Sequence, residues 1–174
     1  IRKSYMKCNK DRIHEFEEDI EKGVKNEERT FGIDEFIWLR TIDTSPTATI
    51  FLYYHIELEQ LFVVKSQKFI DEKLLKREIS NYRKISHPFI CKYYGKLEET
   101  NQISIVVEYI DGHTLSEISQ LNLSEKDKIS IVIEMLHVFR YLHDNNFIYR
   151  DLKPNNIILD RNKSIVLIDF DNMI

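Results

Sequence analysis

The stretch YRDLKPNN occupies residues 149–156, and the tripeptide DFD follows at 169–171 after an apolar run. The first stretch puts a carboxylate, an ammonium group and an amide on one short loop between apolar segments. Single aspartates and lysines are most often solvated surface residues, so either motif alone predicts little. Their meaning depends on the order and spacing of the segments around them.

Five short strands and one helix are predicted over residues 36–107. The cluster at 43–47, Asp-Thr-Ser-Pro-Thr, favours a turn and predicts a hairpin between its flanking strands. Apolar residues at helical spacing predict a helix over 71–85, which His87-Pro88 ends. Strands rich in aromatic and β-branched residues are predicted at 36–39, 50–54, 61–65, 89–97 and 103–107.

A longer helix is predicted over 124–146. Ser124 with Asp127 three residues later resembles a capping box at its start. One helical face carries the apolar residues Ile129, Val132, Ile133, Leu136 and Phe139. Short strands are expected at 147–149, 157–159 and 165–168.

Charged residues dominate 9–29, but Ile13, Phe16, Ile20 and Val24 recur at spacings of three and four. This spacing predicts a solvated amphipathic helix with a narrow apolar stripe, to which we assign no function. We therefore expect an N-terminal helical extension over 1–34.

Composition limits the class of protein. The 29 acidic and 25 basic residues give a net charge of -4, which argues against a nucleic-acid or membrane partner. Cys8 and Cys91 lie far apart and form no metal-ligand pattern, which favours a reducing compartment, the cytoplasm. No apolar run is long enough to span a bilayer. The first residue is Ile1 rather than Met, and both ends look cut.

The order of these segments resembles the eukaryotic protein kinase superfamily from about residue 35 to the end. The resemblance implies an α+β bilobal fold. The small lobe, 35–107, would be a five-stranded antiparallel sheet with one inserted helix, and 108–174 would be the hinge and the first part of a mainly helical large lobe. Because the chain ends three residues after Asp171, we expect a C-terminally truncated copy that exposes the apolar face of its long helix.

Residues 149–156 match the family's catalytic loop H-R-D-L-K-P-x-N, with a tyrosine in place of the histidine, as in some tyrosine-kinase-like families. The resemblance implies that Asp151 accepts or orients the proton of a substrate hydroxyl, and that Lys153 reaches the transferring phosphoryl group. It also implies that Asn156 and Asp169 bind a magnesium ion. A lysine at 153 indicates serine or threonine acceptors.

The resemblance also assigns an ATP site. Lys65 resembles the strand lysine of V-A-I-K, and Glu78 its ion-pair partner. The remaining nucleotide-binding positions that it implies are Ile42, Ile50, Val63, Val107, Glu108, Ile110 and Ile158. The cofactors expected are ATP and Mg²⁺, and the partner is a protein with Ser or Thr acceptors.

Some family features are replaced in this chain. Asp43, Ser45 and Ala48 stand where the family's phosphate loop has glycines, and Asp171 stands in place of the glycine of D-F-G. Glycines let the backbone approach phosphates closely, so we expect these changes to affect ATP binding.

Four aromatic residues match positions that stack between the lobes of active family members: Tyr82, Tyr93, Tyr149 and Phe170. Tyr149 then belongs to an aromatic stack, and its hydroxyl needs a partner if it is buried. Cys91 is expected to be a buried small hydrophobe.

Three functions remain open at this point. The first is an ATP- and magnesium-dependent protein Ser/Thr kinase, because the polar catalytic positions are retained. The second is a pseudokinase or nucleotide-binding scaffold, because of the lost glycines, Asp171 and the short chain. The third and weakest is a small-molecule phosphotransferase of related fold. The sequence does not predict an oligomeric state.

Overall fold

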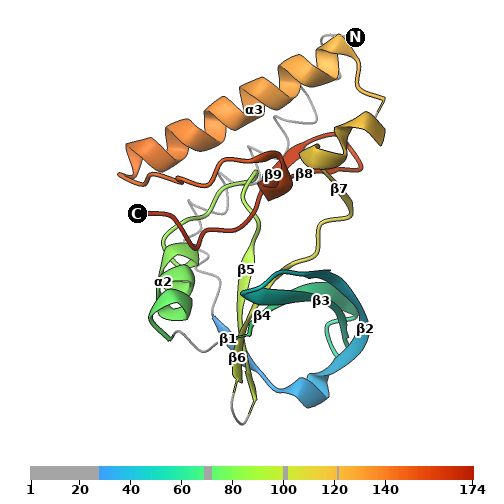
Figure 1. Ribbon diagram of the computed structural model, residues 1–174, viewed down its shortest axis with the longest axis vertical. Coiled ribbons are helices and arrows are strands. Elements are labelled where there is room, and N and C mark those ends of the chain that lie inside the picture. The colour runs from blue at the N-terminus through green and yellow to red at the C-terminus, as the bar shows by residue number, and fades with distance from the viewer. Residues whose placement is uncertain (1–27, 69–71, 100–101, 121) are drawn as a thin grey trace.

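The computed structural model describes residues 28–68, 72–99, 102–120 and 122–174. Figure 1 shows a β-rich lobe with helix α2 beside it and a second lobe that contains helix α3. The larger sheet has the order β1-β5-β6-β4-β3-β2. Its strands are β1 (Arg29–Phe31), β2 (Phe36–Thr44), β3 (Ala48–His55), β4 (Gln60–Gln67), β5 (Tyr93–Glu99) and β6 (Gln102–Glu108).

The five predicted strands of this lobe pair antiparallel, but the prediction missed a sixth. Strand β1 joins the edge of the sheet in parallel with β5, and the 3-10 turn η1 (Ile33–Glu35) leads from it to β2. Three residues in a charged segment are too few to show an alternating pattern. The helix predicted over 9–29 lies outside the described residues except for its last two positions, and there Arg29 begins β1 instead.

One face of the sheet buries an aromatic cluster. The rings of Phe31, Phe36, His55 and Phe62 lie with their centroids 4.9 to 6.0 Å apart. His55 and Phe62 are fully buried. Because Phe31 of β1 belongs to this cluster, the added strand is part of the core of the lobe.

Helix α2 (Glu72–Tyr82) confirms the helix predicted over 71–85, although it ends three residues earlier. Leu75, Ile79 and Tyr82 form its buried side. They pack into the same apolar cluster as Leu142 of the second lobe, so α2 contributes to a core that both lobes share.

The second lobe holds a three-stranded sheet of order β7-β8-β9 beneath α3. Its elements are β7 (Gly112–Thr114), η2 (Leu115–Gln120), α3 (Glu125–Asp144), η3 (Pro154–Asn156), β8 (Ile157–Asp160) and β9 (Ile165–Leu167). Strand β7 was not predicted, and the prediction of a strand at 147–149 is wrong. That segment only exchanges two backbone hydrogen bonds between Ile148 and Ile174, at 2.8 and 3.1 Å.

Helix α3 begins with the predicted capping box between Ser124 and Asp127. Its buried side is partly polar, because Glu134 accepts hydrogen bonds from the Ser164 hydroxyl at 3.1 Å and the Ile165 N–H at 2.8 Å. The opposite side exposes Ile129, Val132, Ile133 and Leu136, as expected from the resemblance. Among the helices that the structure describes, none is long and apolar enough to cross a membrane.

Candidate active site

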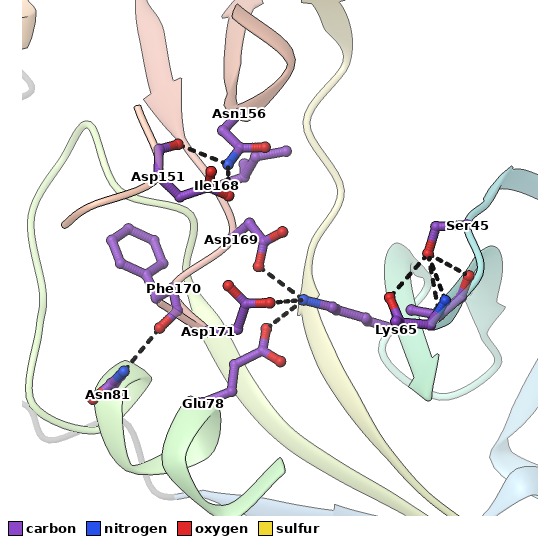
Figure 2. A network of polar contacts seen from close by, with 12 residues as sticks. Ser45, Lys65, Glu78, Asn81, Asp151, Asn156, Ile168, Asp169, Phe170 and Asp171 are labelled. Atoms are coloured by element: carbon purple, nitrogen blue, oxygen red, sulfur yellow. Dashed lines mark hydrogen bonds and ion pairs between the residues drawn. The ribbon is translucent and has the colours of Figure 1, made fainter. Parts of the chain in front are cut away.

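Three elements bring an ammonium group and two carboxylates together between the lobes. Strand β4 carries Lys65, α2 carries Glu78, and Asp169 follows β9. The Lys65 Nζ atom donates to Glu78 Oε1 at 2.9 Å and to Asp169 Oδ1 at 2.8 Å (Figure 2). The ion pair predicted between Lys65 and Glu78 is therefore present, and it joins strand β4 to helix α2.

Burial and charge act in opposite directions on this network. Burial lowers the pKa of Lys65, but the nearby charges of Glu78 and Asp169 outweigh it and raise that pKa above its usual value. Burial raises the pKa of Glu78 to about 7, against the opposing charge of Lys65. Lys65 therefore stays a cation, and Glu78 depends on Lys65 to remain ionised near neutral pH.

The catalytic-loop residues lie on one short segment beside Asp169. Lys153 Nζ donates to Asp151 Oδ2 at 2.8 Å, and Asn156 Nδ2 donates to the same carboxylate oxygen at 2.9 Å. Burial raises the pKa of Asp151, but the hydrogen bonds from Lys153 and Asn156 prevail and lower it. Asp151 is therefore ionised and able to accept a proton or orient a hydroxyl.

The backbone around the site adopts conformations that side chains other than glycine rarely take. Arg150 and Asp169 both have φ of 64°. Asn156 accepts a backbone hydrogen bond from Ile168 at 3.0 Å, which joins the catalytic loop to the segment before Asp169. Left-handed residues of this kind persist only where the surroundings fix them, and they cluster at functional sites.

Asp151, Asp169 and Asp171 form an acidic cluster in which their ligand oxygens lie within 4.8 Å of one another. The Asp171 Oδ1 atom is buried and has no hydrogen-bond partner, which leaves one carboxylate oxygen unsatisfied in the cluster. Burial and the charge of Asp169 raise the pKa of Asp171. Carboxylate oxygens are the ligands that Mg²⁺ prefers, so this side-chain set fits a divalent cation.

The four predicted aromatic residues form one continuous column. The ring of Tyr82 stacks on Tyr93 at 5.5 Å, and Phe170 contacts Tyr82 and Tyr149 edge-on at 5.3 Å each. The Tyr149 hydroxyl donates to the carbonyl of Ile168, so its predicted need for a partner is met. The column crosses from the sheet of one lobe to the segment after β9 in the other.

The strand register places three of the predicted nucleotide-binding side chains on the same face of the sheet as Lys65. Ile50 lies opposite Lys65, and Val63 lies opposite Val107. Ile42 lies at an irregular position of β2, where the register shifts. Glu108 and Ile110 lie at the end of β6 and just beyond it, and Ile158 lies on β8 of the other lobe.

A hollow of about 430 Å³ lies beside the segment between the lobes. Of the residues predicted to bind nucleotide, its lining includes Glu108 alone; the other lining residues are Tyr54, Glu59, Gln60, Leu61, Tyr94 and Tyr109. The hollow is therefore distinct from the surface around Lys65, where the charged groups converge.

The turn at the position of the phosphate loop is closed by Ser45. Its hydroxyl oxygen accepts hydrogen bonds from the N–H groups of Thr47 at 3.3 Å and Ala48 at 3.0 Å. Lys68 Nζ donates to the Ser45 carbonyl at 2.6 Å. Backbone N–H groups that could face a phosphate in a glycine-rich loop are here engaged within the turn.

The sequence did not reveal Asn81. Its side-chain amide, which is buried on α2, donates to the carbonyl of Phe170 at 2.8 Å (Figure 2). It also donates to the carbonyl of Met173 at 3.0 Å. A polar residue between the apolar positions Ile79 and Tyr82 was the available signal, but partners about 90 positions away cannot be identified from spacing. Asn81 ties α2 to the segment that carries Asp169.

Comparison with known proteins agrees with this geometry. The cAMP-dependent protein kinase type 3 of Saccharomyces cerevisiae is 29% identical over 148 residues, covering 80% of this chain and 37% of the yeast protein. The dual specificity protein kinase zak2 of Dictyostelium discoideum is 37% identical over 120 residues, covering 68% of this chain and 18% of that protein.

The serine/threonine-protein kinase PrkC of Bacillus subtilis is 30% identical over 140 residues, covering 76% of this chain and 22% of PrkC. The chain thus spans well under half the length of each of these three relatives. The family model for the protein kinase domain matches residues 42–173, which include the Lys65 network, the catalytic loop and Asp169. The chain therefore belongs to the protein kinase domain family.

Proposed function

We propose that the chain is the catalytic part of a magnesium-dependent protein kinase that transfers the γ-phosphoryl group of ATP to serine or threonine hydroxyls. The observation that carries this proposal is the convergence of Lys65, Glu78, Asp151 and Asp169 from four separate segments. An ion pair with a purely structural role would need only two of these four groups. Positioned charges of both signs around one space suit phosphoryl transfer.

Each polar group has a role in this proposal. Asp151 accepts or orients the proton of the acceptor hydroxyl, and Lys153, 2.8 Å from it, lies where it can contact the phosphoryl group. Lys65 binds phosphate oxygens and is held by Glu78. Asp169 and Asn156 would hold the magnesium ion, which would supply positive charge next to the phosphates.

The nucleotide base binds against the apolar face that includes Ile50, Val63 and Val107, and backbone groups of Glu108 and Ile110 face its edge. The register that puts these side chains on the face of Lys65 supports this placement. Ile42 and Ile158 bound the same space from above and below in this proposal.

Two finer proposals follow from single residues. Lys153 favours serine or threonine acceptors, and the similarity to a serine/threonine-protein kinase supports this choice. Burial raises the pKa of the Cys91 thiol, which is consistent with an inert cysteine in a reducing cytoplasm.

The proposal is tested by transfer of labelled γ-phosphate from ATP to casein, a protein rich in serine, in the presence of Mg²⁺. Asp151→Asn should lower the rate by about 10²- to 10⁴-fold, because the proton acceptor is lost while the shape is kept. Asp144→Asn, at the exposed end of α3, is the matched control and should leave the rate unchanged. A wild-type chain that binds MgATP but transfers no phosphate would support the pseudokinase alternative instead.

A further inference from the structure

Strand β1 precedes the residues 42–173 that match the protein kinase domain, yet it is built into the sheet. Its three residues pair with β5 from Gly95 to Leu97. Phe31 at its end is 2% exposed and lies among the aromatic rings of the core. The position of β1 is therefore fixed by both backbone pairing and burial.

The partner strand is shaped to receive β1. Gly95 has φ of +149°, and a Cβ atom there would lie 1.9 Å from the Arg29 carbonyl oxygen. Only glycine allows both this backbone conformation and this close approach. The register between β5 and β6 also shifts between Tyr93 and Gly95, so the irregularity of β5 lies where β1 joins the sheet.

Glu28, the residue before β1, joins two elements near the active site. The Tyr93 hydroxyl donates to Glu28 Oε1 at 2.9 Å, and Arg83 Nε donates to Glu28 Oε2 at 2.7 Å. Arg83 directly follows α2, and its N–H continues the helical hydrogen bonding to Ile79. One carboxylate therefore ties the end of α2 to the outer ring of the aromatic column.

The tied elements are those that align the charged network. The ring of Tyr93 stacks on Tyr82 at 5.5 Å, and Glu78 lies about one turn earlier on the same helix. Asn81 of this helix also holds the backbone of Phe170. A change in the tilt of α2 moves Glu78 away from Lys65 and loosens the segment after Asp169.

We propose that Glu28 is a positioning residue: through Tyr93 and Arg83, it and β1 hold α2 in the orientation that pairs Glu78 with Lys65. The residues that hold α2 in this orientation thus include Glu28 and β1, which precede the residues 42–173 that match the kinase domain. The consequence for catalysis rests on the proposed kinase function. A measurement of how firmly α2 is held does not depend on that function.

The test is hydrogen exchange of backbone amides in α2, compared with those in α3 and β8, without nucleotide. Glu28→Gln removes the charge that pairs with Arg83, and Tyr93→Phe removes the hydroxyl that donates to Glu28, while both keep side-chain shape. Each should speed exchange in α2 by about three- to tenfold. Exchange in α3 and β8 should not change, whereas a merely structural role would speed it everywhere. Exchange in the double variant should be little faster than in either single variant, because both substitutions break the same link from Arg83 through Glu28 to Tyr93.

Lys96→Gln is the matched control, since it breaks an exposed ion pair with Glu98 on the same strand β5. It should leave exchange in α2 unchanged. The proposal would be overturned if neither Glu28→Gln nor Tyr93→Phe changed exchange in α2, or if exchange became faster by the same factor in all elements. The exchange experiment contains no nucleotide. If the wild type failed to bind ATP, that failure would count against the kinase function, but the exchange result would still test the role of Glu28.

Discussion

At the residue scale, Ser45 shows how one side chain closes the turn that stands where the kinase family has its phosphate loop. Its hydroxyl accepts the N–H groups of Thr47 and Ala48 and thereby holds the turn closed without glycine. Hydroxyls of serine commonly form such local bonds in turns. The turn is ordered, but two donors that a phosphate could use are occupied.

We therefore predict that Ser45→Gly and Ser45→Ala bind MgATP more tightly, by about two- to tenfold, because they free these two N–H groups. Isothermal titration calorimetry measures the affinity directly. Ser45→Thr keeps the hydroxyl and should match the wild type. Unchanged or weaker binding by both variants that lack the hydroxyl would show that the turn does not contact the phosphates.

Asp127 gives a residue-scale prediction about pH. Hydrogen bonds from Lys163 and from Ser124 lower the pKa of Asp127 to about 2. A carboxylate whose pKa is depressed in the folded state stabilises the fold at pH values above its pKa in the unfolded chain, which is near 4. This contribution is lost as the pH falls toward 2.

At pH 6, Asp127→Asn should therefore reduce the free energy of unfolding by about 1–2 kcal/mol, and the difference from wild type should shrink between pH 4 and pH 2. Urea unfolding at several pH values measures it. Glu125→Gln, on the same first turn but exposed, should show no such trend. A difference that stays constant with pH would mean that the charge of Asp127 is not the stabilising feature.

The residues proposed to carry the chemistry could be singled out from the sequence because they lie within short motifs of fixed spacing: Asp151, Lys153 and Asn156 on one loop, and Asp169 after an apolar run. Asn81 and Ser45 were not, since their roles depend on the partners that the fold brings to them. The same holds for Glu28, whose partners are 55 and 65 positions away.

At the element scale, long periodic segments were predicted well, and short strands only where they are continuous apolar runs, as in β8 and β9. Helix α3 and its capping box were found from apolar spacing and from Ser124. Strands β1 and β7 have three residues each, too few for a pattern, and their pairing partners alone make them strands. The strand wrongly expected at 147–149 is apolar, but the fold gives it no neighbouring strand within a sheet.

Gly95 provides the prediction for this scale. Gly95→Ala should lower the free energy of unfolding by about 2–4 kcal/mol, since its Cβ would collide with the Arg29 backbone and strain φ. Chemical denaturation measures the loss. Gly32→Ala is the control: the atoms nearest its Cβ would be side-chain atoms of Asp34 and Glu35 rather than backbone, so the cost should be small. Equal costs for the two variants would contradict the pairing of β1 with β5.

At the scale of the whole molecule, the two lobes meet along the aromatic column and the Lys65 network. Both cross from the sheet lobe to the segment after β9, so the relative position of the lobes and the charged site depend on the same contacts. The exposed apolar residues of α3, Ile129, Val132, Ile133 and Leu136, take no part in these contacts. Nucleotide binding at the junction should therefore stabilise the molecule as a whole.

The most direct test of the central claim is thermal unfolding of the chain with ATP, with and without Mg²⁺. At an ATP concentration of about 100 times the dissociation constant, binding adds about 2.7 kcal/mol of stability, a shift of several degrees. We predict this shift for the wild type with Mg²⁺, and its loss in Lys65→Met and Asp169→Asn. The absence of any shift at millimolar MgATP, or a shift that persists in both variants, would contradict a nucleotide site built on Lys65 and Asp169.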